Sequence, residues 1–390
     1  MVEAIVYVGG EVHSCGRAAI LLKRLQMDVC CKTVQRVIAD VGDELISRRE
    51  NDRLAGETIA MPPQVAVVQC DGGRILTREP GCGPGVHQQA WKETKNAGLF
   101  RMTSEIATDD PHPELPSAFA DRARLAKLTE TAAPDDIDET PEKQGCNDDP
   151  LDVLDKPPSD KYRPRVLVRT VVSSMANSET FGRQMKQEAR HRRFDESARR
   201  AFVGDGLPCN WTIHREHFSD YVPILDFIHV AGYLFAAASV IEKAKDESWS
   251  LYLRLATACW QGRVDEVIGA LSRWLADHDL ADTTSVDPDH PFAAVVTALR
   301  YLRCNRERMD YPSYRRSGLP VTSSLMESLV KQVNLRVKGT DQFWDRPRGA
   351  ERILQIRAAI LSDDDRLARH LTTRPGSPYI RRRKQTAANT

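Results

Sequence analysis

The sequence predicts an α/β fold, in which a mixed β-sheet is flanked by helices and interrupted by an all-helical insertion domain. Short runs rich in β-branched residues, such as residues 65–71 and 165–172, are typical of buried strands. A helical pattern separates the later strands, which places helices on the faces of the sheet. A stretch from about 230 to 310, rich in Ala, Leu, Trp and Arg, is expected to be helical almost throughout. With 390 residues, the chain is long enough for two or three domains.

The overall composition excludes little about function, because unlike segments average out. Apolar residues make up 41% and charged residues 28% of the chain, and the formal net charge is zero, so charge alone does not indicate nucleic-acid binding. No run approaches the roughly 20 apolar residues of a membrane span, and the N-terminus shows no signal-peptide pattern. Nine scattered cysteines without a CxxC pair fit a reducing cytosol. We therefore expect a cytoplasmic protein that does not enter membranes and has neither a disulfide framework nor a structural zinc site.

The N-terminal region, residues 1–58, is expected to hold two short helices, at 16–29 and 32–46. In the second, five aliphatic residues recur at helical spacing and define one apolar face: Val34, Val37, Ile38, Val41 and Leu45. Two short helices with a tight joint are typical of half a helix-turn-helix. A small helical hairpin packed on the core fits the same pattern equally well.

Residues 59–103 should supply the first strands of the sheet. Residues 65–71 are expected to form a buried central strand, and Gly72-Gly73 after them is a hairpin-turn signal. Residues 74–78 would then return as a second strand, and residues 98–103 would add a third. Asp71 is therefore predicted to end the first strand.

Residues 104–160 break this pattern. They contain 16 acidic and 5 basic residues, many prolines and few large apolar side chains. Such a segment buries too little surface to offset its ordering entropy. We expect a mostly disordered insertion with one short helix near 117–129.

The sheet is expected to resume over residues 161–230. A strand at 165–172 is followed by a basic helix from 178 to about 193. A strand at 201–206 then ends in Asp205-Gly206, and a further strand covers 224–229. This succession predicts a mixed sheet with helices on its faces.

A helical insertion domain at 231–316 separates these strands from the final core helices at 317–365. The first of those helices begins near Thr322-Ser323-Ser324, which are good N-cap residues, and Gly339 closes it. One of its stripes is apolar, and the other is polar and includes Glu327. A last helix at 349–361 precedes a polar tail at 366–390, whose basic cluster at 381–384 would add non-specific affinity for DNA.

Three acidic residues stand at informative positions. Asp71 and Asp205 end predicted strands, and Glu327 lies in the first turn of a capped helix. Strand ends of an open sheet tend to bind ligands, and three converging carboxylates suit a pair of divalent cations that act on a phosphodiester. Spacing alone is weak support, because the chain has 55 acidic residues. Taken singly, either aspartate is more often a turn former, and Glu327 a helix-dipole complement paired with Lys331.

A series of motifs along the chain resembles a known family. In order they are Asp71-Gly-Gly-Arg74, Trp91-Lys-Glu-Thr-Lys95, Arg200-Ala-Phe-Val-Gly-Asp205-Gly206, Ile224-Leu-Asp226-Phe-Ile-His229, Gly318-Leu-Pro-Val-Thr-Ser-Ser324, Glu327-Ser-Leu-Val-Lys-Gln-Val-Asn334 and Lys338-Gly-Thr340 with Phe343-Trp344. Together they resemble the insertion-sequence transposases of the ISKra group, bacterial relatives of the Mutator-like DDE transposases. The resemblance covers roughly residues 16–380 and is most specific between residues 318 and 344.

This resemblance implies an RNase H-like core, interrupted by the helical insertion, that cuts and joins DNA. It makes Asp71, Asp205 and Glu327 the catalytic, metal-binding triad for two Mg²⁺ (or Mn²⁺) ions. Asp226-Phe-Ile-His229 matches a Cys/Asp-x-x-His motif of related transposases, which gives Asp226 and His229 a supporting role in DNA contact or strand positioning. The alternative exchanges Asp205 for Asp226 as the second ligand. The Gly-Asp-Gly context favours Asp205, because it leaves that carboxylate exposed at a turn.

The implied substrate is DNA, both the terminal repeats of the element and the target, with a homo-oligomer expected in the synaptic complex at the bacterial nucleoid. Hydrolysis would nick the element ends, and the freed 3′-hydroxyl would attack target DNA. The alternative function is that of a decayed or N-terminally truncated copy, which keeps the fold and binds DNA without catalysing transposition. A non-mobile RNase H-like nuclease would fit the triad but not the segment 318–344.

The sequence departs from the family in two places. Family members usually carry a longer region, often with cysteine pairs, ahead of the helices at 16–46. Either the recognition of element ends is impaired here or the start of the chain is misassigned. The acidic segment 104–160 is also long for its position, and it either mimics the charge of DNA or is simply tolerated.

Seven polar residues are candidates for contacts with the DNA backbone. Four lie on the helix of Glu327 and three in a basic cluster ahead of Asp205: Lys331, Asn334, Arg336, Lys338, Arg190, Arg192 and Arg193. A solvated helix face is the alternative for both groups. Trp249, Trp260 and Trp274 of the helical insertion are expected in its core rather than stacked on bases.

Overall fold

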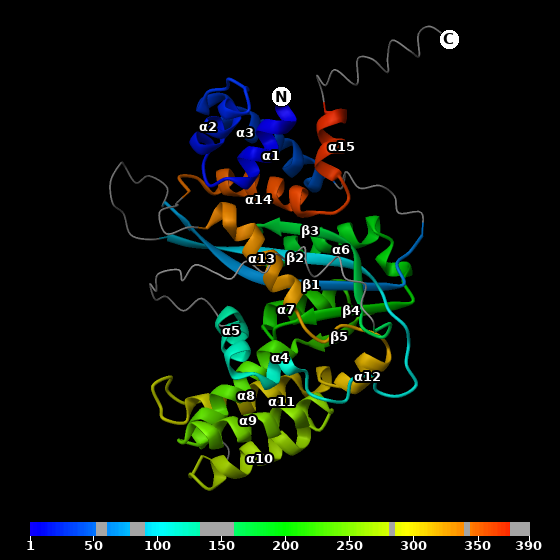
Figure 1. Cartoon of the computed structure of the whole chain (residues 1–390), viewed down its shortest axis with the longest axis vertical. Coiled ribbons are helices and arrows are strands. Elements are labelled where there is room, and N and C mark those ends of the chain that lie inside the picture. Colours follow the sequence, from blue (N-terminus) through cyan, green and yellow to red (C-terminus); the bar gives the residue numbers. More distant parts are fainter. Residues whose placement is uncertain (52–60, 79–89, 133–159, 281–284, 339–343, 375–390) are drawn as a thin grey trace.

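A five-stranded mixed sheet crosses the middle of the molecule in the computed structural model, which describes residues 1–51, 61–78, 90–132, 160–280, 285–338 and 344–374 (Figure 1). In spatial order β3-β2-β1-β4-β5, the strands are β3 (Arg165–Ser174), β2 (Ala90–Thr103), β1 (Val65–Thr77), β4 (Arg199–Gly204) and β5 (Val222–Leu225). β1 pairs antiparallel with β2, and β2 with β3, whereas β4 and β5 run parallel to β1. The predicted α/β class, a mixed sheet flanked by helices, is confirmed, and the strand order is compatible with the predicted RNase H-like fold.

Helices cover both faces of the sheet. Successive residues of a strand point to opposite faces, and two neighbours on β3 illustrate this. Val171 belongs to the apolar core formed with α13 (Ser324–Val337) and α14 (Pro347–Leu361). Val172 belongs to the second core, which includes Phe181 and Met185 of α6 (Ser178–His191). On this second side, α7 (Pro208–His217) packs against β4.

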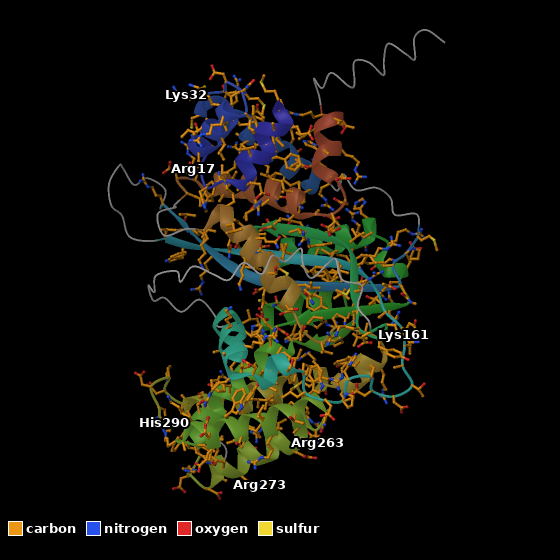
Figure 2. The ribbon with its side chains drawn as sticks, in the orientation of Figure 1. Arg17, Lys32, Lys161, Arg263, Arg273 and His290 are labelled. Carbon is orange, nitrogen blue, oxygen red and sulfur yellow. The ribbon has the colours of Figure 1, made fainter. Side chains whose placement is uncertain are left out.

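The N-terminal helices form a layer over α14. The two predicted helices are present as α2 (Cys15–Arg24) and α3 (Cys31–Glu50), and α1 (Val2–Glu11) precedes them without having been predicted. Val34, Ile38 and Val41 are buried on the face of α3 that the spacing indicated. These helices therefore pack on the core, whereas Arg17 and Lys32 project outward at the end of the molecule opposite the helical insertion (Figure 2).

The insertion between β5 and α13 consists of helices and loops in the part of the chain that the structure describes. It contains α8 (Phe227–Ile241), α9 (Lys245–Trp260), α10 (Val264–Ala276), α11 (Ala293–Asn305), a 3₁₀ turn at 306–308 and α12 (Tyr311–Arg316). Trp260 is buried, as expected of a core residue, and Trp249 and Trp274 pack partly buried against the same core. None of the described helices is long and apolar enough to cross a membrane.

The C-terminal helices extend further than the sequence indicated. The expected helix at 349–361 is present as α14, but a further helix, α15 (Arg366–Thr373), follows it within the segment predicted to be a polar tail. Leu367 and Leu371 of α15 are buried, which explains why this part of the tail is helical. The basic cluster at 381–384 and the expected C-cap Gly339 lie outside the described residues.

The predicted hairpin at Gly72-Gly73 is wrong. β1 continues through both glycines to Thr77 and pairs with β2 along its whole length, with Gly73 opposite Thr94. A Cβ atom on Gly73 would lie 2.8 Å from the Thr94 hydroxyl, so glycine here allows a close cross-strand approach rather than a turn. The strand predicted at 224–229 is also shorter: β5 ends at Leu225, and α8 begins at Phe227.

The expectation that most of 104–160 is disordered is wrong for residues 104–132. These residues include α4 (Ser117–Ala120) and α5 (Arg122–Ala132), the second of which matches the predicted short helix. Phe119 is buried, with its ring centroid 4.9 Å from that of Phe227, and Asp110 pairs with Arg315 of the insertion. The acidic composition gave no sign that this segment packs on the core, because only a few apolar residues make the contact. Residues 133–159 lie outside the described residues.

Candidate functional site

Three aspartates stand in one row at the carboxyl end of the parallel strands. The β1–β4 ladder ends with Gln69 opposite Val203, and two residues further along the chain from each come Asp71 and Asp205. The β4–β5 ladder ends with Gly204 opposite Leu225, and the next residue of each is Asp205 and Asp226. The register therefore brings residues from three separated segments to one edge of the sheet, where open α/β sheets bind their ligands.

The prediction that Asp71 ends its strand is wrong, because β1 continues to Thr77. Asp71 nevertheless lies two residues beyond Gln69, the last residue of β1 that pairs with β4. Its backbone remains paired with Asn96 of β2, and its Oδ1 accepts a hydrogen bond from the backbone N–H of Gly72 at 2.6 Å. Burial, followed by the charge of Asp205, raises the pKa of Asp71 to about 6. Both causes act against a second negative charge at this edge, and a bound cation would remove that penalty.

Asp205 occupies the turn between β4 and α7. Gly206 takes a φ of +96°, which favours glycine, and a Cβ there would lie 2.5 Å from the ring of Tyr301. The Tyr301 hydroxyl donates to the backbone oxygen of Asp205 at 2.7 Å, so α11 of the insertion helps to hold this turn. The Asp205 Oδ1 accepts from the Leu207 N–H at 3.0 Å and from the Asn210 side chain at 2.8 Å. Its Oδ2 accepts no hydrogen bond from the described residues.

Asp226 is placed differently, because its carboxylate is fully buried (0% exposed) and both oxygens have partners. Oδ1 accepts from the backbone N–H groups of Ile228 at 3.1 Å and Ser323 at 3.0 Å. Oδ2 accepts from the Ser323 hydroxyl and from Nδ1 of His229, the latter at 2.9 Å. Asp226 therefore caps α8 and ties it to the start of α13.

His229 lies in the first turn of α8, beside the acidic row. Its burial opposes a positive charge, but the hydrogen bond and charge of Asp226 outweigh that effect, and the pKa of His229 is raised to about 9. The ring is therefore an imidazolium at neutral pH. It brings a positive charge next to the carboxylates of Asp71 and Asp205.

Glu327 reaches the same edge from the first turn of α13. The start of this helix is anchored twice, by Ser323 on Asp226 and by the Gln69 side chain, which donates to the backbone oxygen of Thr322 at 3.2 Å. The Glu327 Oε1 is buried and accepts no hydrogen bond from the residues that the structure describes. Burial, followed by the charge of Asp226, raises the pKa of Glu327 to about 7, and the charge of Asp71 acts in the same direction.

The carboxylate oxygens of Asp71, Asp205 and Glu327 suit a divalent cation, although these side chains would have to change rotamer to bind one together. Among the described residues, no three His, Cys, Asp or Glu side chains stand close enough to hold a metal ion in their present rotamers. Within the described part of the chain, the Asp205 Oδ2 and the Glu327 Oε1 have no donor, whereas both oxygens of Asp226 have one. Mg²⁺ and Mn²⁺ prefer such carboxylate oxygens.

Two of the predicted DNA contacts are wrong, because the side chains are buried. Arg192 is 2% exposed and pairs with Glu188 and Asp364, so it closes a buried ion-pair network under α15. Arg336 is buried on the opposite side of α13 from solvent and donates to the backbone oxygen of Gly9 at 3.0 Å. Neither guanidinium can reach a phosphate without breaking these contacts.

The other predicted contact residues are accessible to different degrees. The side chain of Arg190 is 69% exposed, and that of Arg193 is partly exposed and paired with Glu196. Lys331 is exposed one turn beyond Glu327, and Asn334 and Lys338 are half-buried further along α13. These five remain predictions as DNA contacts.

Sequence reasoning missed the residues that hold the carboxylates in place. Asn210 and Gln69 are buried amides that contact Asp205 and the start of α13, and Tyr301 holds the turn of Asp205 from another domain. Polar residues inside a strand or helix carry no local signal of such contacts. Only Ser323 could have been found, because its N-cap position was visible in the sequence.

Comparison with known proteins gives no match, either among protein-family models or among curated proteins.

Proposed function

We propose that this protein is a DNA transposase that uses Asp71, Asp205 and Glu327 for divalent-cation-dependent cleavage of phosphodiester bonds at element ends and for strand transfer into target DNA. The observation that carries the proposal is the register of β1, β4 and β5, which aligns Asp71 with Asp205 at the edge where α13 also presents Glu327. Three acidic groups crowded at one edge, two of them with raised pKa values, are typical of a site that binds cations.

The free oxygens favour Asp205 over Asp226 as the second cation ligand. Asp205 offers Oδ2, whereas both oxygens of Asp226 are occupied by the two helix starts and His229. Two divalent cations held by Asp71, Asp205 and Glu327 would stabilise the attacking and the leaving oxygen of an in-line displacement at phosphorus. One site can therefore serve both hydrolysis and strand transfer.

The chain's own residues supply the remaining requirements of the reaction. His229, held as an imidazolium by Asp226, is close enough for the charges of Asp205 and Asp71 to act on it, and it would donate its second N–H to a phosphate oxygen. Lys331, one turn along α13 from Glu327, would contact the DNA backbone beside the site. Arg190 pairs with Asp195 near the start of β4, at the opposite end of that strand from Asp205, so it would contact only DNA that extends beyond the site. A transposase acting on chromosomal DNA would work in the bacterial cytoplasm, as a homo-oligomer that pairs two element ends.

The test is a cleavage assay on duplexes taken from both flanks of the gene, labelled on one strand. The wild-type chain should nick these duplexes in Mg²⁺ and leave a 3′-hydroxyl, and EDTA should stop the reaction. Glu327→Gln and Asp205→Asn should lower the rate by orders of magnitude while DNA binding in a mobility-shift assay persists. The amide is a poor ligand for Mg²⁺, whereas the phosphate contacts come from Lys and Arg.

The control variant is Glu247→Gln, which removes an exposed acidic residue from the first turn of α9 and should leave cleavage unchanged. If Glu327→Gln cleaves as fast as the wild type, the triad is wrong. If no form of the protein cleaves but all bind element ends, the protein is a DNA-binding remnant rather than an active transposase.

A further inference from the structure

Asn210 connects β1 to the turn after β4, the two segments that carry Asp71 and Asp205. Asn210 lies in the first turn of α7 and is only 5% exposed. Its Nδ2 donates to the Asp205 Oδ1 at 2.8 Å, and its Oδ1 accepts from the Cys70 thiol at 3.2 Å. Because Cys70 directly precedes Asp71, one amide connects the neighbour of the first carboxylate to the second carboxylate.

The orientation of this amide is favoured mainly by Cys70, whose thiol donates to the Asn210 Oδ1 at 3.2 Å, whereas the Cys209 thiol donates to the same oxygen at 3.8 Å. A flipped amide would place its oxygen against the Asp205 Oδ1, and two acceptors would then face each other. The thiol can donate, so it stabilises the orientation in which the amide oxygen points toward β1. The backbone oxygen of Cys70, 3.5 Å from Nδ2, favours the same orientation.

The effect on Asp205 is to anchor one oxygen and leave the other available. Oδ1 is held by Asn210 and by the Leu207 N–H, whereas Oδ2 has no donor among the described residues. We propose that Asn210 is a positioning residue that presents Oδ2 of Asp205 to a divalent cation, and that Cys70 fixes the orientation of the Asn210 amide. This inference rests on the proposed function, because it concerns the same cation site.

Direct Mn²⁺ binding tests the inference without any activity assay. Free Mn²⁺ is measured by electron paramagnetic resonance during titration of the full chain. Asn210→Ala should weaken Mn²⁺ binding by about 10-fold or more, as expected when a group that orients a metal ligand is lost. Cys70→Val should weaken it as well, because valine fills the space but cannot donate. Cys70→Ser, which keeps a donor, should bind Mn²⁺ close to the wild-type affinity.

The serine and valine variants separate a hydrogen bond from packing. Cys259→Val, at another fully buried thiol within α9, controls for the replacement itself and should leave Mn²⁺ affinity unchanged. If Asn210→Ala fails to fold, the two Cys70 variants carry the test alone. Equal Mn²⁺ affinity for Cys70→Val and Cys70→Ser would overturn the role of the thiol, and wild-type affinity in a folded Asn210→Ala would overturn the role of the amide.

The variant Asp205→Asn shows whether a negative result overturns only the positioning role of Asn210 and Cys70 or the proposed cation site as well. The wild type should bind Mn²⁺ more tightly than Asp205→Asn, with the Asn210 and Cys70→Val variants in between. If the wild type and Asp205→Asn bind Mn²⁺ equally, Asp205 is not a cation ligand, and both the proposed function and the positioning role are overturned.

Discussion

Replacing Glu327 with glutamine should stabilise the cation-free protein at pH 8, although the same change should abolish cleavage. The pKa of Glu327 is raised from 4.5 to about 7 by burial and by nearby acidic groups. The folded protein therefore binds more protons than the unfolded chain between these two values, and its stability falls as pH rises through this range. Glutamine does not ionise in this pH range, so the variant avoids that fall in stability.

The expected size of the effect follows from the pKa. An ionised carboxyl shifted this far would cost the folded protein about 3 kcal/mol, but Glu327 is partly exposed, and solvent screening reduces the cost to ~1–2 kcal/mol. The loss of a favourable charge in the first turn of α13 opposes the gain by ~0.5 kcal/mol, whereas the attraction of Lys331 is already part of the pKa of about 7. We expect the net gain to raise Tm by a few degrees at pH 8 and to be much smaller at pH 5.

The assay is thermal unfolding of both proteins in EDTA at pH 5 and pH 8, repeated with Mn²⁺. Mn²⁺ should raise the Tm of the wild type and should have little effect on Glu327→Gln, because a ligand that binds only the folded state stabilises it. Glu247→Gln should show no pH-dependent gain. A Glu327→Gln variant that is less stable than the wild type by the same amount at both pH values would refute the reasoning.

Three further tests of the fold measure changes in the free energy of unfolding, and two of them compare a substitution with a control. Gly206→Ala should destabilise the protein by about 1–3 kcal/mol, because residue 206 has a positive φ and a side chain there would meet the ring of Tyr301. The control Gly269→Ala, within α10, should stabilise the protein by about 0.5–1 kcal/mol. Equal effects of the two substitutions would contradict the conformation described for the turn at Asp205. Arg192→Ala should lower the stability by about 3 kcal/mol or more, because the buried carboxylates of Glu188 and Asp364 lose a partner. The control Arg190→Ala should have almost no effect on stability, because Arg190 is exposed. A stable Arg192→Ala variant with weakened DNA binding would restore Arg192 as a DNA contact. Phe119→Ala should cost about 3–5 kcal/mol if the segment that carries it is part of the core, and a neutral effect would show that this segment is dispensable.

The sequence predicted the positions of the acidic residues better than it predicted their surroundings. The strand pattern at 201–206 and the N-cap before Glu327 are local signals that placed Asp205 after a strand and Glu327 at a helix start, whereas Asp71 lies inside β1 rather than at its end. The alignment of Asp71 with Asp205 could not be predicted in this way. It depends on which strands become neighbours, and 134 residues separate these two aspartates in the chain.

The errors share a physical cause, which is that tertiary contacts overrode local patterns. Gly72-Gly73 is a turn signal in isolation, but the length of β2 keeps the two glycines within a long antiparallel pair. Arg192 lies in a basic cluster in the sequence, yet its partner Asp364 comes from the far end of the chain. Asn210 gave no signal, because a buried amide is recognised only through what it contacts.

The most direct test of the acidic triad is the position of bound Mn²⁺ in a crystal of the full chain, located by anomalous diffraction. Our account predicts two peaks roughly 3.5–4 Å apart, ligated by Asp71, Asp205 and Glu327, as in two-cation sites that cleave phosphodiesters. Mn²⁺ bound to Asp226 in place of Asp205, or Mn²⁺ only at sites away from this edge of the sheet, would contradict it.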